Sequence, residues 1–123
     1  MTLRLSITVL ILSIALGVAP AGADPALVER VDAENQGGTW RFSVTLRHGD
    51  TGWDDYPDGW RVELADGTIL DTRELLHPHV DEQPFTRSLL GVAIPDGVSE
   101  VFIRARTSVE GWDETRWLHR LGG

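Results

Sequence analysis

The histidines of this 123-residue chain are the first candidates for chemistry, because three of the four stand near carboxylates. His48 precedes an acidic segment, and His77 and His79 form an i, i+2 pair that Asp81 and Glu82 follow. Neutral imidazole and carboxylate can hold Zn²⁺ or Cu²⁺ without thiolates, and the chain has no cysteine. One hypothesis is therefore a Zn or Cu site formed by His48, His77 and His79 with Asp81 or Glu82. The alternative is that these histidines bond loop carbonyls or face solvent, because the i, i+2 spacing is weaker than a true zinc motif.

A second candidate set combines aromatic rings with carboxylates. The tripeptide Gly-Trp-Asp occurs at residues 52–54 and again at residues 111–113. Exposed, the rings would bind a sugar, a quaternary amine or a cationic peptide. Buried, they would close the open end of a sandwich, which is the interpretation that the usual burial of tryptophan favours. The candidate partner-binding residues are Trp53, Asp54, Asp55, Tyr56, Trp112 and Asp113.

Catalytic motifs are missing from the sequence. It contains no Gly-x-Ser-x-Gly elbow, phosphate loop or dinucleotide fingerprint. His79 and Asp81 could form a general-base pair, but no nucleophile accompanies them. The aspartates between residues 50 and 58 do not follow calcium-loop spacing and are interpreted as turn formers. The sequence thus predicts a protein that is not an enzyme, with no catalytic residue and no cofactor beyond the alternative metal.

Short alternating segments must position these residues. Residues 39–48 place Trp40, Phe42, Val44 and Leu46 on one side and polar residues on the other, which is the period of a half-buried strand. The same reasoning predicts strands at residues 26–33, 39–48, 59–65, 68–73, 85–94, 100–106 and 115–121. Trp40 and Trp60 are assigned to the core. Seven short strands separated by Gly, Pro, Asn and Asp predict an all-β, antiparallel two-sheet sandwich.

The connections between these strands are of two kinds. Three are compact turns, and three are longer, at residues 48–58, 74–83 and 107–114. Because successive antiparallel strands reverse direction, the long connections all fall at one end of the sandwich. Their 29 residues carry ten acids, three histidines and no arginine. The excess negative charge of the protein is thus predicted to lie at this end.

The charge balance restricts the possible partners. The chain has 19 acids against 11 arginines, with no lysine, for a net charge of −8. Nucleic acids and anionic lipids are bound mainly by clustered basic residues, so both are excluded as partners. A neutral or cationic protein or envelope component is the expected partner.

The first 23 residues have the three parts of a secretory signal peptide. Arg4 precedes an uncharged apolar run, and Ala21-Gly22-Ala23 supplies a cleavage site of small residues. The apolar run is shorter than a membrane span and Pro20 interrupts it. We expect cleavage after Ala23, export to the periplasm or medium, no stable membrane anchor, and one mature domain at residues 24–123.

Two resemblances add to this interpretation. Residues 90–98 (LGVAIPDGV) leading into residues 101–105 (VFIRA) resemble the corner between the fifth and sixth strands of immunoglobulin-like and fibronectin type III domains. Residues 77–89 (HPHVDEQPFTRSL), with 39–42 (TWRF), 51–54 (TGWD) and 58–62 (DGWRV), are similar to a group of small exported bacterial proteins of unassigned function. The resemblance implies one exported domain and transfers no functional residue.

Overall fold

The computed structural model describes residues 24–122, and this part of the chain is all-β. The signal peptide predicted for residues 1–23 lies outside the described residues. The strands are β1 (Leu27–Gln36), β2 (Thr39–Arg47), β3 (Pro57–Glu63), β4 (Ile69–Glu74), β5 (Phe85–Val92), β6 (Glu100–Thr107), β7 (Gly111–Trp112) and β8 (Trp117–Arg120). None of the described residues forms a helix that could span a bilayer.

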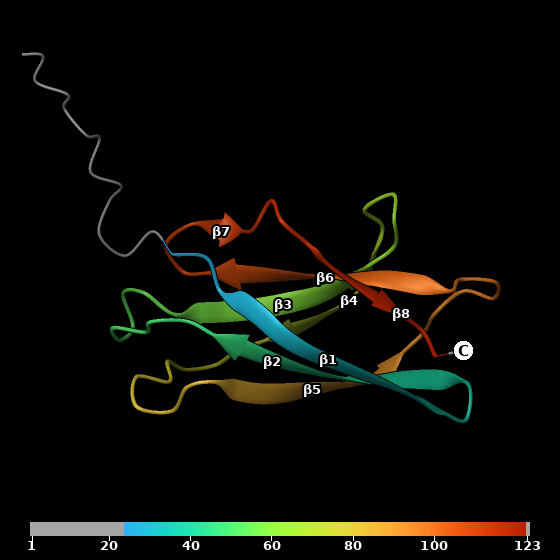
Figure 1. Ribbon diagram of the computed structural model, residues 1–123, viewed down its shortest axis with the longest axis horizontal. Helices are drawn as coiled ribbons and strands as arrows, with labels where there is room; N and C mark the ends of the chain where they lie inside the picture. The colour runs from blue at the N-terminus through green and yellow to red at the C-terminus, as the bar shows by residue number, and fades with distance from the viewer. Residues whose placement is uncertain (1–23, 123) are drawn as a thin grey trace, which may run out of the picture.

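The strands form two antiparallel sheets that pack against each other (Figure 1). The first sheet has the order β1-β2-β5. The second has the order β4-β3-β6, and both β7 and β8 pair with the far side of β6. The predicted two-sheet antiparallel architecture is thereby confirmed.

The core lies between the sheets and follows the period of two in the sequence. Phe42, Val44 and Leu46 on β2 are buried, as are Trp60 and Val62 on β3. On β6 the buried residues are Val101, Ile103 and Ala105, the three that the alternation places inward. Trp60 is a core residue as predicted, whereas Trp40 is only partly buried and packs against the edge of the core.

The last predicted strand differs from the observed one. Instead of one strand over residues 115–121, the chain forms β7, leaves the ladder, and returns as β8. Arg104 stabilises this interruption, because its guanidinium donates to the carbonyl oxygens of Asp113 and Glu114. Arg116, the last residue before β8, donates to the carbonyl oxygens of Leu64 and Ala65, which directly follow β3. Such side-chain-to-backbone bonds are not visible in a hydrophobic pattern.

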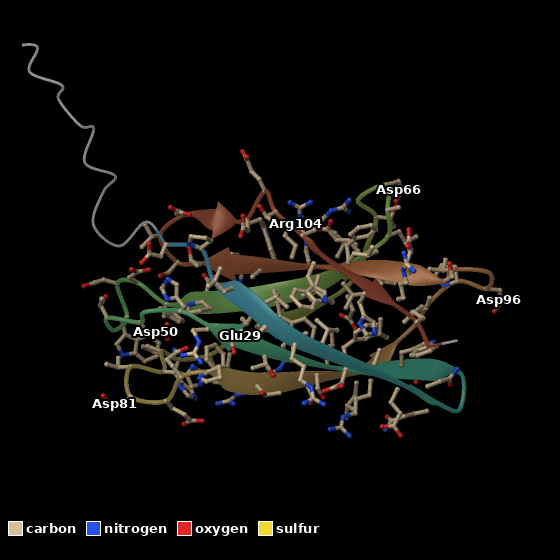
Figure 2. The ribbon with its side chains drawn as sticks, viewed as in Figure 1. Glu29, Asp50, Asp66, Asp81, Asp96 and Arg104 are labelled. Carbon is tan, nitrogen blue, oxygen red and sulfur yellow. The ribbon has the colours of Figure 1, made fainter. Side chains whose placement is uncertain are left out.

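The two ends of the sandwich differ as expected. Residues 48–56, 75–84 and 108–110 connect β2 to β3, β4 to β5 and β6 to β7, and all three lie at the same end (Figure 1). We call these residues the loop end. The compact turns β1–β2, β3–β4 and β5–β6 lie at the opposite end. Figure 2 shows the same division, with Asp50 and Asp81 at the loop end and Asp66 and Asp96 at the other.

Candidate functional site

The base of the loop end is a buried polar cluster centred on His48. The Nδ1 atom of His48 lies 2.7 Å from Oδ1 of Asp50. Its Nε2 atom lies 3.0 Å from the carbonyl oxygen of Asp24 and 3.5 Å from Oδ1 of Asp55. The side chains of His48 and Asp50 are fully buried. Both ring nitrogens therefore face oxygen atoms, and the ring joins the first loop to the start of the described chain.

The second loop is attached to the same cluster. Oδ2 of Asp50 accepts a hydrogen bond of 2.7 Å from the backbone N–H of His79. The side chain of Gln83 accepts from the backbone N–H of His48 and donates to the carbonyl oxygen of His79. Buried polar groups that are satisfied in this way hold their segments in one arrangement. Gln83 is a central member of the cluster that the sequence interpretation missed.

The ring of His79 is enclosed by neighbours of different kinds. It stacks on Phe85, with centroids 3.9 Å apart, and a guanidinium nitrogen of Arg87 lies 2.7 Å from its Nε2 atom. Burial lowers the pKa of His79, and the positive charges of Arg87 and His77 lower it further, against smaller opposing effects of Asp50 and Glu82. Arg87 thus contacts the imidazole of His79 directly.

The first loop carries an exposed turn above this buried base. The N–H of Asp55 donates to the carbonyl oxygen of Gly52, and the N–H of Thr51 donates to the carbonyl oxygen of Asp55. Gly52 has a φ of 140°, a backbone conformation that residues with a Cβ rarely adopt. Trp53 and Asp54 stand at the tip of this turn and are exposed, whereas Asp55 is buried below it.

Trp53 does not close the end of the sandwich. Its side chain is 67% exposed and meets Tyr56 edge to face, with centroids 5.6 Å apart. The favoured expectation of a buried plug is therefore wrong for Trp53, which does not belong to the core cluster. Tyr56 is bonded through its backbone to Ser108 of the third loop, which ties the first loop to the third.

Trp112 has a different set of neighbours. It belongs to β7 at the edge of the second sheet and is half-buried. The guanidinium carbon of Arg61 lies 4.0 Å from its ring centroid and that of Arg106 lies 4.8 Å from it. These are cation–π contacts on the outer surface of the sheet. Trp112 and Asp113 thus line the sheet edge, where Asp113 accepts from the N–H of Thr115, and they do not join Trp53 at the loop tip.

The outer surface of this sheet also holds a buried carboxylate. Glu63 is fully buried and is bonded to Arg61, Arg104 and Arg116. Burial alone would raise the pKa of Glu63, but the hydrogen bonds and charges of Arg104 and Arg61 outweigh it, so the pKa lies below its ordinary value. The alternating pattern of the strand predicted at residues 59–65 did not indicate that Glu63 would be buried.

The three histidines that were expected to bind a metal, His48, His77 and His79, contact different groups. The rings of His77 and His79 are 4.5 Å apart, but Nδ1 of His77 lies 3.0 Å from the carbonyl oxygen of Pro78. Both nitrogens of His48 face oxygens within its own cluster, and Asp81 and Glu82 are exposed. Across residues 24–122, no three His, Asp or Glu side chains are grouped closely enough to hold a metal ion. The expected convergence of His48, His77 and His79 is not observed there.

Of the ten acids in the long connections, eight lie in or next to the loop end and divide into two groups. Asp50 and Asp55 are buried, and Asp58 and Glu74 pair with Arg106. The exposed acids of the loop end are Asp54, Asp81, Glu82 and Glu110. Within the described chain none of these four forms an ion pair. They are the carboxylates that the loop end presents to solvent.

Each loop also presents an apolar side chain, which the sequence interpretation missed. Besides Trp53, the side chains of Leu76, Val80 and Val109 are 75%, 53% and 51% exposed. Apolar residues placed within a polar segment, outside any strand period, are the signal that could have identified them. The loop end therefore combines four exposed apolar side chains with four unpaired carboxylates.

Comparison with known proteins gives one partial relative. The chain is 45% identical over 71 residues to a protein named "Putative lipoprotein" from Halomicrobium mukohataei. The match covers 58% of this chain and 34% of the relative, so the chain spans about a third of that protein's length. No family model matches the sequence, and no solved structure matches it.

Proposed function

We propose that this protein is an exported, non-catalytic β-sandwich domain that binds a protein or another envelope component through its loop end. The observation that carries the proposal is Trp53, a large aromatic side chain held two-thirds exposed on a turn whose base is buried. Tryptophan is among the residues that most often dominate binding energy at protein interfaces. Tryptophans are highly buried on average, so a side chain that is 67% exposed is unusual for this residue.

The rigidity of the base supports this role. Asp50 and Gln83 accept hydrogen bonds that link the first and second loops, and the backbone N–H of Tyr56 donates to Ser108 of the third loop, so the loop tips are ordered before a partner arrives. Ordering a flexible interface side chain on binding costs about 0.5–1.5 kcal/mol. A loop end that is already ordered avoids part of this cost.

The proposed location draws on the signal-like residues 1–23 and on the relative that is named a lipoprotein. We infer export, with cleavage after Ala23 and a mature domain in the periplasm or the medium. Residues 1–123 include no cysteine, the residue that carries a thioether-linked lipid.

The strand order favours a fibronectin type III-like sandwich among the two related types. In constant-type immunoglobulin domains the fourth strand joins the sheet of the first, second and fifth strands. Here β4 pairs with β3 in the other sheet. We therefore infer the fibronectin-like arrangement, which by itself carries no function.

Site-specific photo-crosslinking tests the proposed function. A photoreactive residue replaces Val80 or Val109 at the loop end, and Asp66 or Asp96 at the opposite end, in cells that make the protein. We expect the same adduct from both loop-end positions and none from the opposite end, with at least a fivefold loss when Trp53→Ala is added. Equal adducts from both ends, or no adduct from any position, would overturn the proposal.

A further inference from the structure

The exposed Asp and Glu side chains of the loop end have no arginine or lysine beside them among the loop residues. Asp54, Asp81, Glu82 and Glu110 come from three different loops, and none has an ion-pair partner in the described chain. The loop end contains no arginine, and the chain contains no lysine. An approaching cation therefore meets no arginine or lysine of these loops.

Charge alone would not hold a partner here. Exposed ion pairs contribute little to binding individually, because water screens them. The same surface offers Trp53, Leu76, Val80 and Val109, whose exposed apolar area would be removed from water on binding. A partner that matches this surface must carry both positive charge and apolar side chains.

Trp53 provides a place for one such charge. The face of a tryptophan ring attracts a guanidinium or ammonium group, and the adjacent carboxylate of Asp54 adds to the attraction. Trp112 of this same protein shows the geometry, because Arg61 lies 4.0 Å from its ring centroid. Trp53 has no arginine over its ring among the described residues, and most of its surface is exposed.

We propose that the partner of the loop end is a basic polypeptide segment that carries both arginine or lysine and apolar residues, and that one cationic side chain lies over Trp53 beside Asp54. This rests on the proposed function and specifies the partner's chemistry. Uncharged saccharides match the rings but not the four carboxylates, and acidic or nucleic-acid partners would be repelled.

Peptide titration followed by NMR tests the inference on the intact protein. The probes are three capped six-residue peptides that contain alternating arginine and leucine, arginine and serine, or glutamate and leucine. We expect the arginine–leucine peptide to shift the resonances of Trp53, Val80 and Val109. The arginine–serine peptide should bind at least fivefold more weakly, and the glutamate–leucine peptide should not bind.

Matched variants locate the contact. Trp53→Ala and Asp54→Asn should each weaken the arginine–leucine peptide at least fivefold, whereas Asp96→Asn, the same charge change at the opposite end, should leave binding unchanged. Circular dichroism checks that each variant is folded.

Three results would overturn the inference: equal binding of the glutamate–leucine peptide, unchanged binding to Trp53→Ala, or no binding of either arginine peptide at millimolar concentration. If the crosslinks at Val80 and Val109 form while the peptides fail, only the basic character of the partner is wrong and the proposed function stands.

Discussion

The carboxylate of Asp50 joins two loops that are 29 residues apart in the chain, because its Oδ2 accepts the backbone N–H of His79 at 2.7 Å. Its other oxygen lies 2.7 Å from the ring of His48. One buried side chain thus positions both the turn that carries Trp53 and the loop that carries Val80. The exposed surface of the loop end depends on this contact beneath it.

Removing that carboxylate should destabilise the protein. Asp50→Ala leaves the N–H of His79 and a ring nitrogen of His48 buried without acceptors, and we expect the free energy of unfolding to fall by about 2–4 kcal/mol. Urea denaturation measures the change. Asp54→Ala, in the same loop but exposed, is the control and should stay within about 0.5 kcal/mol of the unaltered protein. Similar effects of the two substitutions would show that Asp50 has no special role.

Gly59 should not tolerate a side chain. A Cβ atom at this position would lie 3.0 Å from a guanidinium nitrogen of Arg106 and 3.3 Å from the carbonyl oxygen of Arg73. Gly59→Ala would therefore displace Arg106 from Asp58 or widen the sheet, and we expect a cost of about 1–3 kcal/mol. Gly49→Ala is the matched control, because nothing lies within 4 Å of its added Cβ. Thermal unfolding of both variants compares the two sites, and equal melting temperatures would contradict the prediction.

His79 should make the stability depend on pH. Burial lowers its pKa in the folded protein, so the unfolded chain binds a proton at higher pH than the folded chain does. The free energy of unfolding should therefore fall as the pH drops below about 6.5. His79→Gln should reduce this fall, and His119, whose pKa burial also lowers, should account for part of the remainder. Melting temperatures between pH 7.5 and 5.5 test the prediction, with His77→Gln as the exposed control. An unchanged slope in His79→Gln would refute it.

Glu63 should contribute stability that is lost in acid. Its pKa is lowered in the folded state, so the unfolded chain takes up its proton first as the pH falls below about 4.5. At neutral pH, Glu63→Gln removes the charge that faces Arg61, Arg104 and Arg116, and we expect a loss of about 2–4 kcal/mol. The variant should also lose stability less steeply between pH 5 and 3. Glu34→Gln, an exposed acid on β1, should match the unaltered protein in urea titrations at each pH.

The tryptophans of the loop tip and the core should behave in opposite ways. Trp53→Ala should change the free energy of unfolding by less than about 1 kcal/mol, because most of the ring is exposed and Tyr56 meets it edge to face. Trp60→Ala leaves a cavity in the core and should cost about 3–5 kcal/mol. Guanidinium unfolding measures both. A large loss in Trp53→Ala would restore the plug interpretation.

The candidate site was predictable only in outline. That the long loops gather at one end followed from strand reversal, and the acidic character of that end followed from composition. The division of the acids did not follow, because Asp54 and Asp55 are adjacent and chemically alike while one is exposed and the other buried. The role of Gln83 depends on a loop that returns to within hydrogen-bond distance of His48, 35 residues away.

The sequence by itself determined most of the strands and most of the core, because alternation of apolar and polar residues is a local pattern that a sheet must satisfy. It also determined the net negative charge of −8. Only the tertiary structure decided which of two identical tripeptides is exposed. Trp53 lies on a turn beyond the edge of both sheets, whereas Trp112 meets Arg61 and Arg106 on adjacent strands. The physical reason is that exposure depends on what the rest of the chain places around a residue, and not on the residues beside it in the sequence.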